Sequence, residues 1–239
     1  MKKFLILTGL FFMSAMVLKA QNLVYDPNAS IRKVENFSGV SVGSGINVYL
    51  SQGKEQGVAV SAGEEKYTAK IKTEVRNGVL KIYLENGFWN GWSWGNKKVK
   101  AYVTVTELNS LELSGGSVGK IADPINVNKL KMELSGGSIA EGKFTGSSLD
   151  IDLSGGSIAK LDGTFDAANI EASGGSIFKD FAIAVNNCNV DASGGSVVNL
   201  TINKALKADA SGGSVIHYKG TGVIMSVDAS GGSSIRKQD

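Results

Sequence analysis

Acidic side chains recur at one fixed position in the second half of the sequence. Each lies two residues before a Ser-Gly-Gly-Ser tetrapeptide, which occurs seven times at intervals of 18 to 21 residues. Carboxylates at the same phase of successive repeats would form a column able to share cations, and calcium prefers such oxygen ligands. The column is therefore a candidate calcium site, made of Glu112, Glu133, Asp152, Glu171, Asp191, Asp209 and Asp228.

The alternative is that these acids are the polar residues of a solvent-facing strand and bind no metal. Nearby lysines would then balance their charge, namely Lys131, Lys143, Lys160, Lys179 and Lys207.

A second candidate site is the segment that holds all three tryptophans within six residues, Trp89, Trp92 and Trp94. Glycine and asparagine residues between them are typical of a loop. Aromatic faces stack on sugar rings, and tryptophan is enriched where proteins bind partners. We therefore expect either a ligand-binding loop or a lid that covers an open end of the fold.

The remaining residues offer few candidates for catalysis. The chain has three arginines and one histidine, His217, which we interpret as an ordinary strand residue. No catalytic triad, phosphate-binding loop or Cys/His metal cluster is recognisable. We expect a protein that is not an enzyme and has no cofactor, with calcium at the acidic column left open; the alternative is a polysaccharide-active enzyme, a pectinase-like lyase or hydrolase.

The residues around each acid predict the element that carries it. Apolar residues flank the acid on both sides in all seven copies, as Leu111 and Leu113 flank Glu112. Alternation with a period of two indicates a strand with one face buried. The glycine pair would end that strand in a tight corner. After it an aliphatic residue, such as Ile139 or Ile158, restarts the pattern, and Cys188 falls at an inward position.

A unit of about 19 residues cannot bury an apolar face by itself, so such units must stack. Pairing of each strand with its equivalent in the next unit gives an all-β fold, a single-stranded parallel β-helix whose coils rise by about 4.8 Å each. A β-sandwich would show hairpins every 8 to 12 residues, and leucine-rich repeats would show an asparagine ladder. Neither pattern is present.

The N-terminus has the features of a signal peptide over residues 1–20. Lys2 and Lys3 precede an apolar run over 4–18, which is shorter than the roughly 20 residues that span a bilayer. We expect cleavage after Ala20, an exported chain without a transmembrane segment, and a location in the periplasm, on the outer-membrane surface or outside the cell. The remaining chain has 22 basic (25 − 3) and 22 acidic residues, so charge gives no reason to expect nucleic-acid binding.

Two regions follow the signal peptide: a less regular β region over 21–110, which forms the first coils or a cap, and the seven-copy repeats over 111–239. The run from Gly43 to Gly53, containing Gly45-Ile46-Asn47, and the Ser-Gly-Gly-Ser train resemble the autotransporter-adhesin head GIN domain family over about residues 37–235. This resemblance implies a right-handed, pectin-lyase-like β-helix in exported proteins of Bacteroidetes-like bacteria. It implies no catalytic or binding residues.

These observations favour a non-enzymatic surface module that adheres to a glycan or a cell-envelope protein. A structural envelope protein is the alternative. The last coil would leave unpaired strand edges, so we also expect a homo-oligomer.

Overall fold

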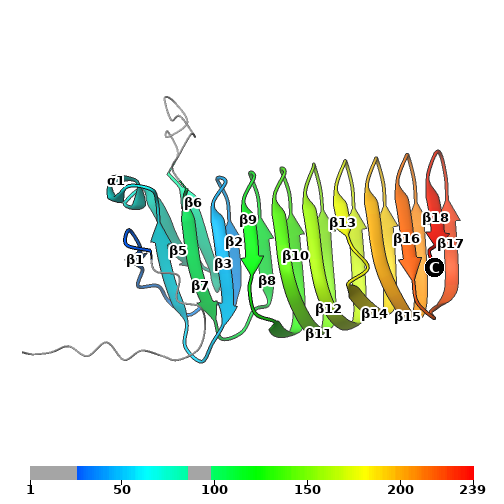
Figure 1. The fold of residues 1–239 in the computed structure, drawn as a ribbon, viewed down its shortest axis with the longest axis horizontal. Coiled ribbons are helices and arrows are strands. Elements are labelled where there is room, and N and C mark those ends of the chain that lie inside the picture. The colour runs from blue at the N-terminus through cyan, green and yellow to red at the C-terminus, as the bar shows by residue number, and fades with distance from the viewer. Residues whose placement is uncertain (1–25, 86–97) are drawn as a thin grey trace, which may run out of the picture.

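The computed structural model describes residues 26–85 and 98–239, which are almost entirely β-strand (Figure 1). The predicted signal peptide, residues 1–20, lies outside the described residues. One short helix, α1, spans Glu65–Thr68. The strands are β1 (Ser30–Ile31), β2 (Gly39–Val42), β3 (Asn47–Gln52), β4 (Gly57–Ser61), β5 (Ile71–Arg76), β6 (Val79–Leu84), β7 (Lys100–Val105), β8 (Ser110–Leu113), β9 (Val118–Ile121), β10 (Ile125–Leu134), β11 (Ile139–Leu153), β12 (Ile158–Ala172), β13 (Ile177–Lys179), β14 (Ile183–Ala192), β15 (Val197–Ala210), β16 (Val215–Lys219), β17 (Val223–Ala229) and β18 (Ser234–Lys237).

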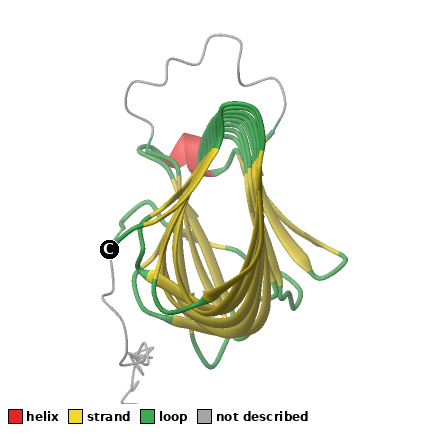
Figure 2. Ribbon diagram, turned by 90° about the vertical axis from the view of Figure 1, so that its right-hand side faces the viewer, coloured by secondary structure: helices red, strands yellow, loops and turns green. Residues whose placement is uncertain are grey.

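Each Ser-Gly-Gly-Ser repeat belongs to one coil of a parallel β-solenoid. Strands β11 and β12 pair in parallel, from Ile139 opposite Ile158 to Leu153 opposite Ala172. Parallel pairing continues in both directions along the repeats, so the coils stack on one axis (Figure 1) and their outlines superimpose when viewed along it (Figure 2). The prediction of an all-β parallel solenoid is confirmed. A β-sandwich is excluded because successive repeats pair in parallel and not as hairpins.

The core fills the interior of the coils. In the first six repeats both residues that flank the acid are buried, as Leu111 and Leu113 are beside the exposed Glu112. Cys188 is 4% exposed, and its burial raises the pKa of the thiol to about 12. The prediction that Cys188 packs as a small core residue is therefore confirmed.

In the strand that follows each turn, the buried residues are one position later than the sequence pattern predicts. The aliphatic residues after the turn, such as Ile139 and Ile158, are half-buried, whereas the next residues, Ala140 and Ala159, are fully buried. The reason is the second serine of the turn, which itself points inward; Ser138 is 0% exposed. Strand alternation then places the following residue outward.

The Ser-Gly-Gly-Ser turn is built from a positive φ and a buried hydroxyl. The first glycine has a φ of 60° to 69° in all seven copies, a region that glycine adopts at no steric cost. The N–H of the second serine donates to the carbonyl of the first, as from Ser214 to Ser211 at 3.3 Å. Ser214 Oγ also donates to Ala192 O in the preceding coil at 2.8 Å, so the turns are joined from coil to coil.

Ser214→Ala should lower the free energy of unfolding by about 1 kcal/mol, because it removes a buried hydrogen bond between coils. Ser157 is the matched control: it occupies the same turn position, but its buried Oγ has no hydrogen-bond partner. Ser157→Ala should be neutral or slightly stabilising. Urea denaturation of both variants measures the difference, and equal losses would contradict this assignment of the hydroxyl's role.

The N-terminal region contributes both coils and a cover. Strands β2 and β3 form a coil joined by Gly43-Ser44-Gly45, with Val42 opposite Leu113 and Asn47 opposite Val118. The coil of β6 and β7 lies outside it, although it comes later in the sequence, because β6 pairs with β2 and β7 with β3. Beyond this coil, β5 and β4 add antiparallel to β6 and β7, and β1 adds to β4.

Candidate functional site

The seven predicted acids form one continuous column on the outside of the solenoid. Each is paired in register with its equivalent in the next coil, from Glu112 opposite Glu133 to Asp209 opposite Asp228. All seven are exposed. Parallel strands lie about 4.8 Å apart, so like charges recur at that interval along the column. Ser41 of β2 continues the column at its N-terminal end without a charge.

The charges beside this acidic column are only partly balanced. Lys131 Nζ lies 2.6 Å from Glu133 Oε1, and this hydrogen bond raises the pKa of Lys131. Lys207 occupies the equivalent position in a later coil, two residues before Asp209. The other predicted partners lie elsewhere on the coil, and the expectation that they balance the column is wrong for Lys143, Lys160 and Lys179. The chain bends after each turn, so residues close in sequence face different sides.

A second column of charged and polar side chains runs along the strands that follow the Ser-Gly-Gly-Ser turns, and we call it the basic column because its net charge is positive. Its in-register members are Lys120, Glu141, Lys160 and Lys179, and further along Asn199, His217 and Arg236. Lys160 donates to Glu141 at 2.9 Å, which lowers the pKa of Glu141 and raises that of Lys160. His217 Nδ1 lies 3.1 Å from Asn199 Oδ1, so this histidine is an ordinary member of a strand surface. This column is therefore net positive, with Lys120, Lys160, Lys179 and Arg236 against Glu141, whereas the acidic column is negative in every coil.

Metal binding by the acidic column stays a prediction. In residues 26–85 and 98–239, no three or more His, Cys, Asp or Glu side chains gather in a way that could hold a metal ion. In-register side chains leave the strands side by side, one from each coil, and so do not surround a common centre.

The tryptophans Trp89, Trp92 and Trp94 lie outside the described residues. The strands on either side of them are described: β6 ends at Leu84 and β7 begins at Lys100. Asn47, which follows a turn, pairs with Lys100, and Val42, which precedes it, pairs with Ile82. The two strands therefore approach the same corner at which the Ser-Gly-Gly-Ser turns join the other coils.

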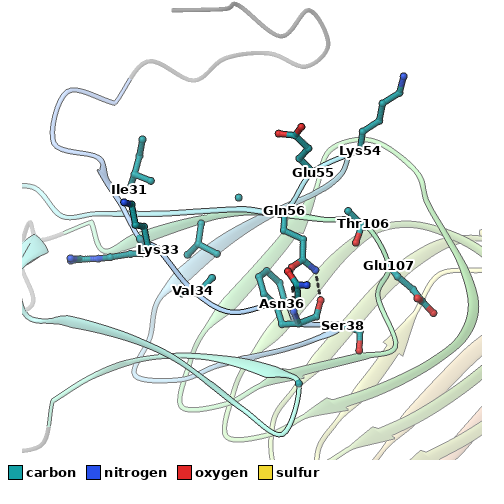
Figure 3. Close-up of a pocket in the computed structure, with 15 residues that line it drawn as sticks. Ile31, Lys33, Val34, Asn36, Ser38, Lys54, Glu55, Gln56, Thr106 and Glu107 are labelled. Atoms are coloured by element: carbon teal, nitrogen blue, oxygen red, sulfur yellow. Dashed lines mark hydrogen bonds between the residues drawn. The ribbon is translucent and has the colours of Figure 1, made fainter.

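An open cleft near the N-terminal end was not predicted from the sequence. Its volume is ≈ 970 Å³, and its walls come from three separate segments, 31–38, 54–58 and 106–107, with Gly78 (Figure 3). Gln56 fixes one wall by bonding to the backbone N–H and C=O of Phe37. Basic side chains (Arg32, Lys33 and Lys54) and acidic ones (Glu55 and Glu107) share the lining. No single segment carries a recognisable motif, so nothing in the sequence would reveal this cleft.

A buried ion pair holds the N-terminal cover together. Asp26, whose side chain is 8% exposed, accepts hydrogen bonds at Oδ2 from Lys100 (3.0 Å) and Tyr102 (2.9 Å). Its Oδ1 accepts from the Ser61 hydroxyl (2.9 Å) and the Asn28 backbone N–H (3.2 Å). Burial raises the pKa of Asp26, but these donors outweigh it and lower the pKa to about 2. The cluster ties residue 26 to β4 and β7 and has a structural role.

No helix in the described part of the chain is long and apolar enough to cross a membrane.

The family model described as "Putative auto-transporter adhesin, head GIN domain" matches residues 36–222. No curated protein matches the chain in sequence. Among solved structures, a "putative adhesin" from Bacteroides fragilis is 21% identical with a TM-score of 0.81, covering 88% of this chain and 96% of that one. A "putative lipid binding protein" from Parabacteroides distasonis is 23% identical with a TM-score of 0.62, covering 87% and 96%. A "putative adhesin" from Parabacteroides merdae is 15% identical with a TM-score of 0.65, covering 88% and 95%. At these identities the structures show a shared fold.

Proposed function

The chain belongs to the family described as "Putative auto-transporter adhesin, head GIN domain", and from that premise we propose that it is an exported, non-enzymatic binding module. Its role is adhesion to a glycan or to a protein of the cell envelope. It acts in the periplasm, on the outer-membrane surface or outside the cell.

The observation that carries this proposal is the pair of charged columns. The acidic column runs along seven coils and the basic column follows the opposite side of the turns, both fixed by the hydrogen-bonded ladder. A rigid row of carboxylates that repeats at about 4.8 Å suits an elongated or repetitive partner. The uniform repeat along the ladder supports recognition by many weak, equivalent contacts.

Several features support binding without catalysis. Glycoside hydrolysis needs two carboxyl groups at a defined separation, one of them with a raised pKa. The ladder carboxylates are instead exposed and equivalent from coil to coil. The tryptophans remain a second candidate contact for a sugar, because an indole face stacks on a sugar ring.

A glycan array and a panel of envelope proteins, probed with residues 21–239, test the proposal. Asp152→Asn/Asp191→Asn should weaken binding at least tenfold if the acidic face makes the contact. The matched control is Asp162→Asn/Asp166→Asn, which changes the net charge equally on another side of the coil and should leave binding unchanged. Trp92→Ala with an unaltered melting temperature tests the tryptophan segment in the same assay.

Two outcomes would contradict parts of this proposal, and a third would contradict the calcium prediction. Release of reducing or unsaturated sugars from pectin-like substrates would favour the enzyme. Equal losses in the ladder variant and its control would remove the acidic face from the contact. A melting temperature that does not change between millimolar calcium and EDTA would exclude calcium from the acidic column.

A further inference from the structure

The C-terminal end of the solenoid leaves its core uncovered. Every residue of β17 is exposed, including Val223 (65%), Ile224 (44%), Met225 (63%) and Val227 (44%). These are four of the five large apolar side chains that are exposed in the described part of the chain. The exposed apolar surface is thus concentrated at one end, the end that faces the viewer in Figure 2.

Two of the uncovered residues, Ile224 and Val227, are core positions that lack a next coil. Ile224 lies opposite the buried Leu206, and Val227 lies opposite the buried Ala208. Met225 lies in the register shift between these pairs and is also exposed. Strand β17 pairs with β15, and β18 pairs with β16. Each therefore presents its other edge, with backbone N–H and C=O groups able to pair with another strand.

The final residues do not cross this end. The backbone N–H of Gln238 donates to Tyr218 O, and Lys219 Nζ donates to Asp239 O. Residues 234–239 thus continue the ladder of the preceding coil. The N-terminal end differs, because β4 and β5 add antiparallel strands to the outermost coil there and α1 contacts β4.

We propose that two copies of this chain associate through their C-terminal coils, end to end and related by a two-fold axis. Such an arrangement covers both exposed apolar ends and is closed, because the opposite end of each copy carries its antiparallel cover. The pairing extends each sheet across the interface by antiparallel strand addition.

Charge selects which strands face each other. Strand β17 runs into the last turn and carries the exposed Asp228, whereas β18 runs out of it and carries the exposed Arg236 and Lys237. A two-fold axis through the turn places β17 of one copy against β18 of the other, running antiparallel. Asp228 then faces the basic side chains of the second copy. Pairing β17 with itself would instead bring two Asp228 carboxylates together.

Sedimentation equilibrium of residues 21–239 at tens of micromolar tests this arrangement. We expect twice the mass of one chain. Asp228→Arg alone and Arg236→Asp alone should each weaken dimerisation at least tenfold, and the double variant should restore it. Glu171→Arg is the control, since it makes the same kind of change in the same column three coils away.

Hydrogen exchange supplies a second measurement that does not depend on the variants. Amides of 223–229 and 234–237 should exchange more slowly as the protein concentration rises. A monomer at these concentrations overturns the proposal, as does a dimer that neither single variant weakens. Glycan binding is a separate measurement, so loss of one property leaves the other to be judged independently.

Discussion

Gly163→Ala should destabilise the solenoid by about 3 kcal/mol or more, the largest effect that we expect from a single methyl group. Gly163 lies in β12 opposite Phe144 of the preceding coil and has a φ of 125°. A Cβ at this position would lie 1.7 Å from the backbone oxygen of Phe144. That oxygen belongs to the ladder, so the clash cannot be relieved by rotating a side chain.

Gly156→Ala is the control for this prediction. Gly156 lies seven residues earlier, does not have a positive φ, and an added Cβ would meet nothing within 4 Å. Thermal and urea unfolding should show a large loss for Gly163→Ala and little change for Gly156→Ala. Hydrogen exchange would show whether the loss spreads beyond neighbouring coils, since stability in stacked repeats depends on adjacent units. A stability for Gly163→Ala close to that of the natural chain would contradict the close approach of the two backbones.

Asp26→Asn should lower the free energy of unfolding by about 2 kcal/mol at neutral pH, because it removes the carboxylate that pairs with Lys100. The pKa of Asp26 is lowered to about 2 in the folded protein, from an ordinary value of 3.8. A lowered pKa stabilises the folded state above the unfolded-state value. This contribution is therefore complete above about pH 5 and is lost as the pH falls toward 2.

Urea denaturation between pH 2 and 7 measures this dependence. The difference between the natural chain and Asp26→Asn should shrink from about 2 kcal/mol at pH 7 to near zero at pH 2. Asp123→Asn provides the control, since Asp123 is an exposed residue in the segment before β10, and its difference should stay small throughout. A difference that is independent of pH would show that Asp26 acts by shape and not by charge.

The repeated half of the fold was predictable because its pattern is local. Alternation around Glu112 and its equivalents identifies the strand and its inward face, and the recurrence of one motif at one phase identifies parallel stacking. The acidic column follows from the same reasoning, since equivalent residues of stacked coils must lie in register. What this column binds remains a proposal.

The N-terminal half was less predictable because its contacts are not between neighbours in sequence. The coil of β2 and β3 lies between β6–β7 and β8–β9, so the chain leaves the stack and later adds a coil outside the earlier one. No periodicity encodes that order. The cleft between 31–38, 54–58 and 106–107 depends on it, and so does the burial of Asp26 between β4 and β7.

The sequence by itself determined the solenoid, its exposed acids and the glycine turns, because strand alternation and positive φ are properties of a few adjacent residues. Tertiary structure alone decided which residues are buried after each turn. The second serine of the turn is buried, so the next residue faces outward and the one after it is buried. It also separated Lys143, Lys160 and Lys179 from the acids that they were expected to balance, since each coil bends between them. The uncovered C-terminal end, with Met225 displaced by a register shift, is a tertiary property for the same reason: burial there depends on a neighbouring coil.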